Sequence, residues 1–190
     1  MIESVRLLKD EIGLISAYLV GIPAEMKANK FQYTAAADAD QPEKNKTALK
    51  NHFKLIAQLY PRLQKKYGKE LADEVMGKVV VKLANCFFKG FKPIGPTDKF
   101  PAFAKIYKDF ESHNLVFEVI QETDTKLEVM VSRCLIYEAM KDLGMGDLIQ
   151  NLCQFAFTYF QSYHPKVKYL KDKMIGKGDT CCHETFLWVE

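Results

Sequence analysis

The sequence predicts an α+β fold, in which a mainly helical amino-terminal half packs against a four-stranded antiparallel sheet with an inserted helix pair. Apolar residues recur at helical spacing over residues 1–91, and in two later segments they alternate with polar residues, as strands do. The chain has 190 residues, of which 48% are hydrophobic and 27% charged, and it is long enough for a buried core. We therefore expect a single α+β domain over residues 1–190, with the sheet and the helix pair in residues 114–190.

The helical half is expected to contain three helices. Gly21, Pro23 and the polar run at residues 35–45 should separate the first helix from the second. Gly68 should end the second helix and precede the third, because glycine suits the left-handed position just past a helix end. Pro61 lies inside the second helical pattern, so we expect either a kink there or a helix boundary just before it.

The second half should begin with a short helix and then change to strands. Leu115, Phe117 and Val119 alternate with polar residues, and a turn then leads to a second alternating segment, which predicts a hairpin. We expect this hairpin to share one sheet with the last two strands. In the third strand the alternation slips by one residue near Leu170, which predicts a β-bulge. The expected elements are a helix at residues 98–111, the hairpin at 115–131, helices at 134–143 and 147–163, and strands at 166–175 and 181–189.

Composition and charge argue against several classes of protein. A net charge of +3 does not favour nucleic-acid binding, and the basic residues between positions 44 and 69 fit a solvated helical face. The uncharged run at residues 12–24 is too short to span a bilayer, and acidic residues precede it where a signal peptide carries basic ones. The five cysteines are odd in number and two are adjacent, so we expect a reducing, cytoplasmic location without disulfides.

A set of residues in the last third of the chain resembles a known family. The set consists of Arg133-Cys134, Tyr137-Glu138, Leu143-Gly144, Leu148, Leu152-Cys153 and Gly178-Asp179-Thr180-Cys181-Cys182. It is similar to the L-2-amino-thiazoline-4-carboxylic acid hydrolase family, in which a cysteine closes a strand, a glycine-linked helix pair carries a second cysteine, and a glycine-aspartate turn leads to a third. The resemblance implies a pocket between the sheet and the helix pair, and a reaction that opens a cyclic isothiourea to a carbamoyl-cysteine.

Two positions depart from the family pattern. Ala156 stands where the family usually has an aspartate, three residues after its second cysteine, and this removes an acid/base group. Glu184 follows His183 where the family usually has an aromatic residue. More distantly, the sheet and the carboxy-terminal turn are similar to 4-vinyl-reductase-type small-molecule-binding domains. In this chain Lys171 and Met174 lie near the places where those domains carry the glutamate and cysteine of their metal site.

Four residues are candidates for catalysis. Cys134 is the best-placed nucleophile, because it lies where a strand leads into a helix and the unpaired amides of a helix start stabilise a thiolate. Glu138 lies one turn further on the same helical face and can exchange a proton there. The resemblance adds Cys182 and His183 after the carboxy-terminal turn. The competing interpretation is that Cys134 is an ordinary core residue, which is the more frequent role of a buried cysteine.

The adjacent cysteines are not expected to form a two-cysteine site, since successive residues of a strand face opposite sides. Cys182 should approach Cys134 across the pocket, whereas Cys181 should not. A site for zinc or another divalent metal, built from Cys134, Cys153, Cys182 or His183, is chemically admissible. The sequence has no Cys-x-x-Cys pair that would indicate one.

Substrate binding is assigned to residues near the same motifs. Arg133 is expected to hold a substrate carboxylate, because its planar guanidinium pairs with two oxygens at once, and Lys168 is the alternative cation. Both fit equally well as solvent-facing strand residues. The resemblance adds Tyr137, Cys153 and Asp179 to the binding residues.

Three functions remain open from the sequence, so it is undecided whether the protein is an enzyme. The first is a hydrolase that acts on a small cyclic amidine or isothiourea. The second is a small-molecule-binding or sensory module that kept the pocket without the reaction, which the alanine at position 156 favours. The third is a structural partner in a larger assembly, or a homo-oligomer, and exposed apolar residues on the amino-terminal helices would be its sign.

Overall fold

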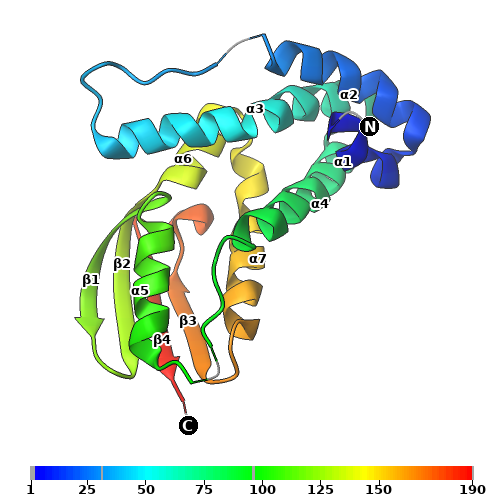
Figure 1. Cartoon of the computed structure of the whole chain (residues 1–190). Helices are drawn as coiled ribbons and strands as arrows, with labels where there is room; N and C mark the ends of the chain where they lie inside the picture. The colour runs from blue at the N-terminus through cyan, green and yellow to red at the C-terminus, as the bar shows by residue number, and fades with distance from the viewer. Residues whose placement is uncertain (1–2, 31, 96, 190) are drawn as a thin grey trace.

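The computed structural model describes residues 3–30, 32–95 and 97–189, and it has the predicted α+β fold (Figure 1). Its helices are α1 (Glu3–Ile12), α2 (Leu14–Ala28), α3 (Gln41–Tyr67), α4 (Lys69–Phe88), α5 (Phe100–Glu111), α6 (Leu135–Asp142) and α7 (Ile149–Ser162). Its strands are β1 (Leu115–Glu122), β2 (Lys126–Cys134), β3 (Val167–Lys173) and β4 (Cys182–Trp188). Two short 3-10 helices, η1 (Gly146–Leu148) and η2 (Ile175–Lys177), precede α7 and β4.

The four strands of the described residues form one antiparallel sheet in the order β1-β2-β4-β3. β1 and β2 form the predicted hairpin, and β4 lies between β2 and β3. The last strand in sequence is therefore central: Glu184 of β4 lies opposite Val129 of β2 on one side and Lys171 of β3 on the other. This pairing confirms that the hairpin and the two later strands share one sheet.

The predicted bulge in β3 lies two residues later than expected. Lys171 pairs with Glu184 and Lys173 with His183, so Asp172 is the extra residue. Lys171 keeps the inward phase of the strand because it pairs with a buried carboxylate, and its side chain is only 9% exposed. The apolar pattern placed the slip at Leu170 because a lysine was not expected on the covered face.

The helical half differs from the prediction at its first break. α1 and α2 are separated at Gly13, which has a φ of 76°, and α2 continues through Gly21 and Pro23. The break expected at Gly21 and Pro23 is therefore wrong. Gly21 permits close packing instead, because a Cβ atom there would lie 2.7 Å from Oγ of Ser4 in α1.

The later helix boundaries follow the sequence more closely. The carboxylate of Asp40 caps α3 by accepting a hydrogen bond of 2.9 Å from the Glu43 N–H. Gly68, with a φ of 85°, separates α3 from α4 as predicted. α3 runs through the exposed Pro61, so the helix boundary that was one of the two expectations at this proline is wrong.

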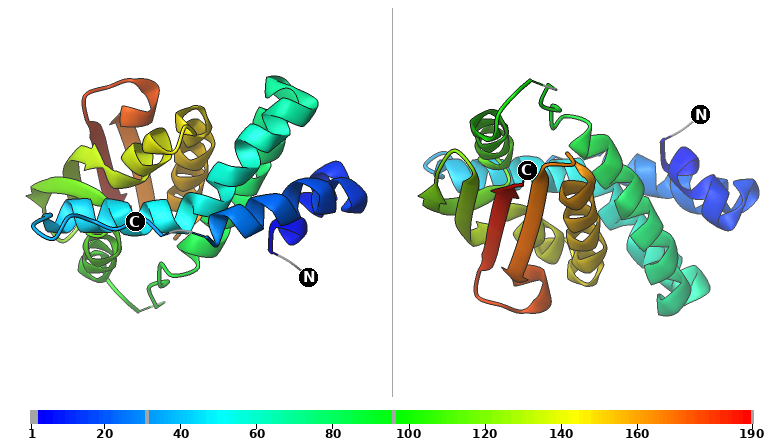
Figure 2. Two further views of the ribbon diagram at one scale, coloured as in Figure 1. Left: turned by 90° about the horizontal axis from the view of Figure 1, so that it is seen from above. Right: turned by 90° about the horizontal axis from the view of Figure 1, so that it is seen from below.

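The core consists of two hydrophobic clusters. The first joins α1–α4 with α6 and the start of α7. The second joins α5 and α7 to one face of the sheet, where the ring centroids of Phe103 and Phe160 lie 5.0 Å and 5.4 Å from that of Phe186. Figure 2 shows α1 and α2 at the end of the molecule away from the sheet. A space left between the two clusters is thus enclosed by both halves of the chain.

Three large apolar side chains of α2 are exposed. Leu14, Leu19 and Met26 are 53%, 65% and 61% exposed, which is the sign that the hypothesis of a protein partner requires. None of the described helices combines the length and the apolar character that crossing a membrane would require.

Candidate functional site

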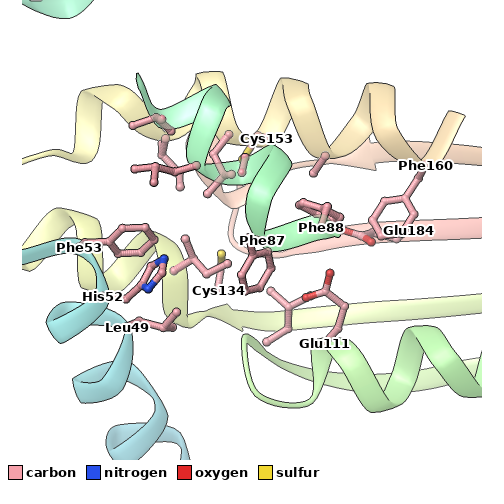
Figure 3. A pocket seen from close by; sticks show the side chains of 18 of the residues that line it. Leu49, His52, Phe53, Phe87, Phe88, Glu111, Cys134, Cys153, Phe160 and Glu184 are labelled. Atoms are coloured by element: carbon pink, nitrogen blue, oxygen red, sulfur yellow. The ribbon is translucent and has the colours of Figure 1, made fainter. Parts of the chain in front are cut away.

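A cavity of about 90 Å³ lies between the two hydrophobic clusters (Figure 3). On the scale where one water needs about 10–15 Å³, this is room for roughly six to nine waters or a small organic molecule. The walls are mainly apolar, and three helices supply most of them, with Phe53 and Ile56 of α3, Val80 and Phe87 of α4, and Ile149 and Phe160 of α7. The exposed His52 also lines the cavity, beside Phe53, at the end away from Glu184.

The other end of the cavity is polar and deeply buried. Glu111, at the end of α5, is 6% exposed, and Glu184 of β4 is 4% exposed. Nζ of Lys171 lies 2.7 Å from Oε1 of Glu184, and the Tyr107 hydroxyl donates a hydrogen bond of 2.8 Å to Oε2. Both oxygens of Glu184 are therefore occupied, whereas Glu111 lines the cavity without a salt bridge among the described side chains.

Glu111 has an unusual protonation equilibrium. Burial raises the pKa of its carboxyl to about 8, and the nearby charge of Glu184 raises it further. Asn114 and Lys171 oppose this rise but do not cancel it. Near neutral pH both protonation states are populated, with the neutral acid in excess, which is the condition under which a carboxyl group transfers protons efficiently.

Lys171 and Tyr107 keep their protons. Burial is the largest single influence on Lys171 and lowers its pKa, but the charge and the hydrogen bond of Glu184, together with the nearby Cys182 and Cys153, raise the pKa overall. Burial, followed by the charge of Glu184, raises the pKa of Tyr107 well above its ordinary value. Lys171, which is paired with Glu184, is thus a fixed cation beside the titrating Glu111.

Cys134 lies at the cavity where β2 leads into α6, as predicted. Its Sγ caps α6 by accepting a hydrogen bond of 3.4 Å from the Tyr137 N–H. Burial of the thiol nevertheless raises its pKa to about 12, and the helix-start amide only opposes this rise. Near neutral pH the neutral thiol therefore dominates in this conformation, in contrast to the thiolate expected for a nucleophile at a helix start.

The two other cysteines of the motif lie near Cys134. The electrostatic influence of Cys153 and Cys182 on its thiol adds to the rise of the Cys134 pKa. Cys153 lines the cavity, and a Cβ atom at Gly176 of η2 would lie 3.0 Å from its Sγ. Cys182 is buried, and its Sγ accepts a hydrogen bond of 3.3 Å from the Ile175 N–H. Burial raises the pKa of both thiols.

The structure places several of the predicted site residues away from the cavity. Arg133 donates to Glu138 at 2.6 Å and 2.8 Å and to Glu43 at 2.7 Å, so its guanidinium joins β2 to α6 and α3. Neither Arg133 nor Glu138 lines the cavity. Tyr137 contributes its backbone N–H to the cap of α6, and its side chain packs against the first cluster. The alternative cation, Lys168, is exposed.

The carboxy-terminal candidates divide between the two sides of β4. Cys182 and Glu184 share the covered side, and His183 lies on the other, where its ring nitrogens are each 2.8 Å from a carboxylate, of Glu128 and of Asp172. Asp179 accepts a hydrogen bond of 2.7 Å from the Met174 N–H and shapes the turn. Within the described part of the chain, no three Cys, His, Asp or Glu side chains form a group that could hold a metal ion. The zinc set considered from the sequence is not assembled, because His183 points away from the thiols.

Glu111, Lys171 and Glu184 were not selected as site residues from the sequence. A signal for them existed, since each is a charged residue in the buried phase of its element. Glu111 follows the buried Tyr107 by one helical turn, and Lys171 follows the buried Tyr169 by two strand positions. Charged residues in such positions are rare unless paired or functional.

Comparison with sequence models of protein families gives a match over most of the chain. A sequence model of the L-2-amino-thiazoline-4-carboxylic acid hydrolase family matches residues 48–186. No curated protein matches the sequence.

Similar solved structures include proteins of the H-NOX family. One is an unliganded Fe(II) H-NOX protein from K. algicida, with 15% identity, coverage of 99% of this chain and 94% of that one, and a TM-score of 0.37. Another comes from work on heme distortion in the H-NOX family, with 12% identity, 98% and 91% coverage, and a TM-score of 0.39.

Proposed function

Because the chain belongs to the L-2-amino-thiazoline-4-carboxylic acid hydrolase family, we propose that it binds a small cyclic amidine or isothiourea in the cavity and hydrolyses it. The observation that carries this proposal is the buried, titrating carboxyl of Glu111 at the end of an otherwise mainly apolar cavity. The cavity volume suits the substrate class, since a thiazoline ring with an amino and a carboxyl group has about nine non-hydrogen atoms.

The reaction requires one water and one proton carrier. Water adds to the ring carbon between sulfur and nitrogen and loses a proton, and the carbon–sulfur bond then breaks. The sulfur receives the proton, and the product is a carbamoyl thiol. Glu111 can accept the proton of the attacking water and return it to the sulfur, because its pKa of about 8 lets it exist in both forms near neutral pH.

Cys134 is the alternative reacting group within the same function. As a nucleophile it would attack the ring carbon in place of water, and water would later release the product. Its raised pKa disfavours this route, because the neutral thiol is a poor nucleophile. The Glu111 route is therefore the assignment that we propose.

A small-molecule-binding module without hydrolysis is the second candidate function. Ala156, at the position where the family usually has an aspartate, lines the cavity. Its methyl group offers no acid or base at that point of the wall. This favours a ligand-binding role for the same cavity, and the two functions differ only in turnover.

Turnover of two compounds separates the candidates. Purified protein is incubated with 2-amino-thiazoline-4-carboxylate and with 2-amino-thiazoline, and loss of the ring is followed by proton NMR. We expect the wild type to open the ring of at least one of the two compounds. In Glu111→Gln the rate of ring opening should fall by about 10²-fold or more, as for removal of a general acid–base group. Cys134→Ser should retain activity within a few-fold.

The matched control is Glu118→Gln, because Glu118 is an exposed strand residue that does not line the cavity. It should be as active as the wild type. A large loss of turnover in Cys134→Ser, together with full activity in Glu111→Gln, would show that the thiol of Cys134 and not the carboxyl of Glu111 is the reacting group. Binding of either compound without ring opening would favour the binding module.

A further inference from the structure

We propose that the ligand of this cavity is a small organic monocation, an amine or amidinium on an apolar body, whose charged group pairs with the carboxyl of Glu111. This inference rests on the proposed ligand-binding role of the cavity and adds the charge of the ligand. It differs from the substrate that the family description names, because that compound also carries a carboxylate.

The polar end of the cavity offers a partner for a cation. Glu184 is satisfied, with Lys171 at 2.7 Å from one oxygen and the Tyr107 hydroxyl at 2.8 Å from the other. Glu111 is nine-tenths buried, lines the cavity and has no cationic partner among the described residues except the more distant influence of Lys171. An ammonium or amidinium group would supply the missing charge, and hydrogen-bond donors in addition to the one from Asn114.

The cavity offers no matching partner for a ligand carboxylate. Lys171 is the only lysine or arginine among the described lining residues, and it is paired with Glu184. Arg133, which the sequence suggested for this role, lies outside and is paired with Glu43 and Glu138. His52 lines the opposite, exposed end beside Phe53. A carboxylate bound at the polar end would therefore be desolvated beside two glutamates.

Binding of a cation should be coupled to the proton of Glu111. The charged or titratable groups that face this carboxyl are Glu184 of β4 and Lys171 and Tyr169 of β3, with Tyr107 of its own helix behind Glu184. The thiols of Cys134 and Cys153 line the same cavity. Burial raises the pKa of Tyr169 and of both thiols, so these groups stay neutral near neutral pH. Lys171 and Tyr107 stay protonated near neutral pH, because the pKa of each is raised. Glu111 therefore changes charge between pH 6 and pH 9 at the buried end of the cavity, and below about pH 8 a bound cation must expel its proton.

Benzamidine is the test ligand, because it is an apolar ring with an amidinium that stays protonated over this range and has about nine non-hydrogen atoms, which suits the cavity. Calorimetric titration should show affinity rising by about 10²-fold from pH 6 to pH 9, following the ionisation of Glu111. At pH 7, titrations in two buffers of different ionisation enthalpy should show release of about one proton per ligand. Benzamide and benzoate should bind at least tenfold more weakly than benzamidine at pH 9.

Variants assign the effect to the carboxyl. Glu111→Gln should remove the proton release and flatten the pH profile, and Glu118→Gln should leave both unchanged. The proton count for the wild type does not depend on the folding of any variant. Equal binding of benzamide and benzamidine at pH 9, absence of proton release, or absence of benzamidine binding at pH 9 would each overturn the inference.

The same data separate this inference from the proposed reaction. If benzamidine binds as expected and neither thiazoline is opened, the inference stands and the hydrolase proposal fails. If the carboxylated thiazoline is opened while cations show no preference, the hydrolase proposal stands and the inference fails.

Discussion

At the scale of the residue, Glu111 carries a cost that should be visible in the stability of the protein. Its carboxyl prefers the proton in the folded state, where its pKa is about 8, and gives it up near its ordinary pKa of 4.5 when the chain unfolds. Between these values the unfolded state binds fewer protons than the folded state. The contribution of Glu111 to stability is thus fully present below the unfolded pKa and is lost as the pH rises toward 8.

We predict that Glu111→Gln removes this loss. Between pH 5 and pH 8, the free energy of unfolding of the wild type should fall relative to that of the variant by an amount on the order of 3 kcal/mol. Urea titrations at several pH values measure it, with Glu118→Gln as the control that should follow the wild type. Parallel profiles for the wild type and Glu111→Gln would show that this carboxyl has an ordinary pKa.

Single residues also show where sequence reasoning was limited. Periodicity located Cys134 where a strand leads into a helix, and the family resemblance implied a pocket at that place. It could not show that burial outweighs the helix-start amide at the thiol, since that depends on which distant segments cover it. Arg133 was predicted to bind the substrate because of its chemistry. Its guanidinium is already paired with Glu43, which is ninety positions away, and the sequence alone does not show that these two residues meet.

At the scale of the element, the short helix η2 is fitted closely against α7. A Cβ atom at Gly176 would lie 3.0 Å from Sγ of Cys153, whereas one at Gly146 of η1 would meet nothing closer than 3.9 Å. Both glycines are in 3-10 helices, and neither has a positive φ. The pair therefore isolates the effect of packing from that of backbone conformation.

We predict that Gly176→Ala destabilises the protein by about 1–2 kcal/mol, as overpacking of a core does. Gly146→Ala should be close to neutral. In the double variant with Cys153→Ala, the penalty of Gly176→Ala should disappear, which a double-mutant cycle of unfolding free energies can measure. An unchanged penalty in the double variant would mean that the thiol is not the obstacle.

Elements were predicted best where local pattern decides them. The hairpin of β1 and β2 and the boundary at Gly68 follow from alternation and from glycine geometry. The first break was misplaced because Gly21 has a reason that only tertiary packing shows, namely the approach of Ser4. The bulge lies later in β3 than predicted because Lys171, although charged, continues the set of buried residues of the strand through its ion pair with Glu184.

At the scale of the whole molecule, the cavity exists because the two hydrophobic clusters do not merge completely. Its lining includes Phe53 and Val80 of the first cluster, and Phe88 and Phe160 of the second. A bound ligand would therefore contact both halves of the chain and should stabilise them together.

We predict that Ala156→Leu fills the cavity. The larger side chain should weaken benzamidine binding by tenfold or more while leaving the protein folded, because the added carbon atoms occupy existing space. Gln154→Leu, at an exposed position of the same helix, is the control and should bind like the wild type. Thermal melts with and without ligand provide the measurement, and retained binding in Ala156→Leu would place the ligand elsewhere.

The position of β4 in the sheet has a consequence for synthesis on the ribosome. β4 is later in sequence than the three other strands, yet it lies between β2 and β3. A nascent chain that has not reached residue 182 can form the first hairpin, but β3 then has no neighbour and Lys171 no counter-charge. β4 thus completes the sheet and the polar end of the cavity at the same time. A chain stalled before β4 is synthesised exposes an unpaired strand to chaperones and proteases.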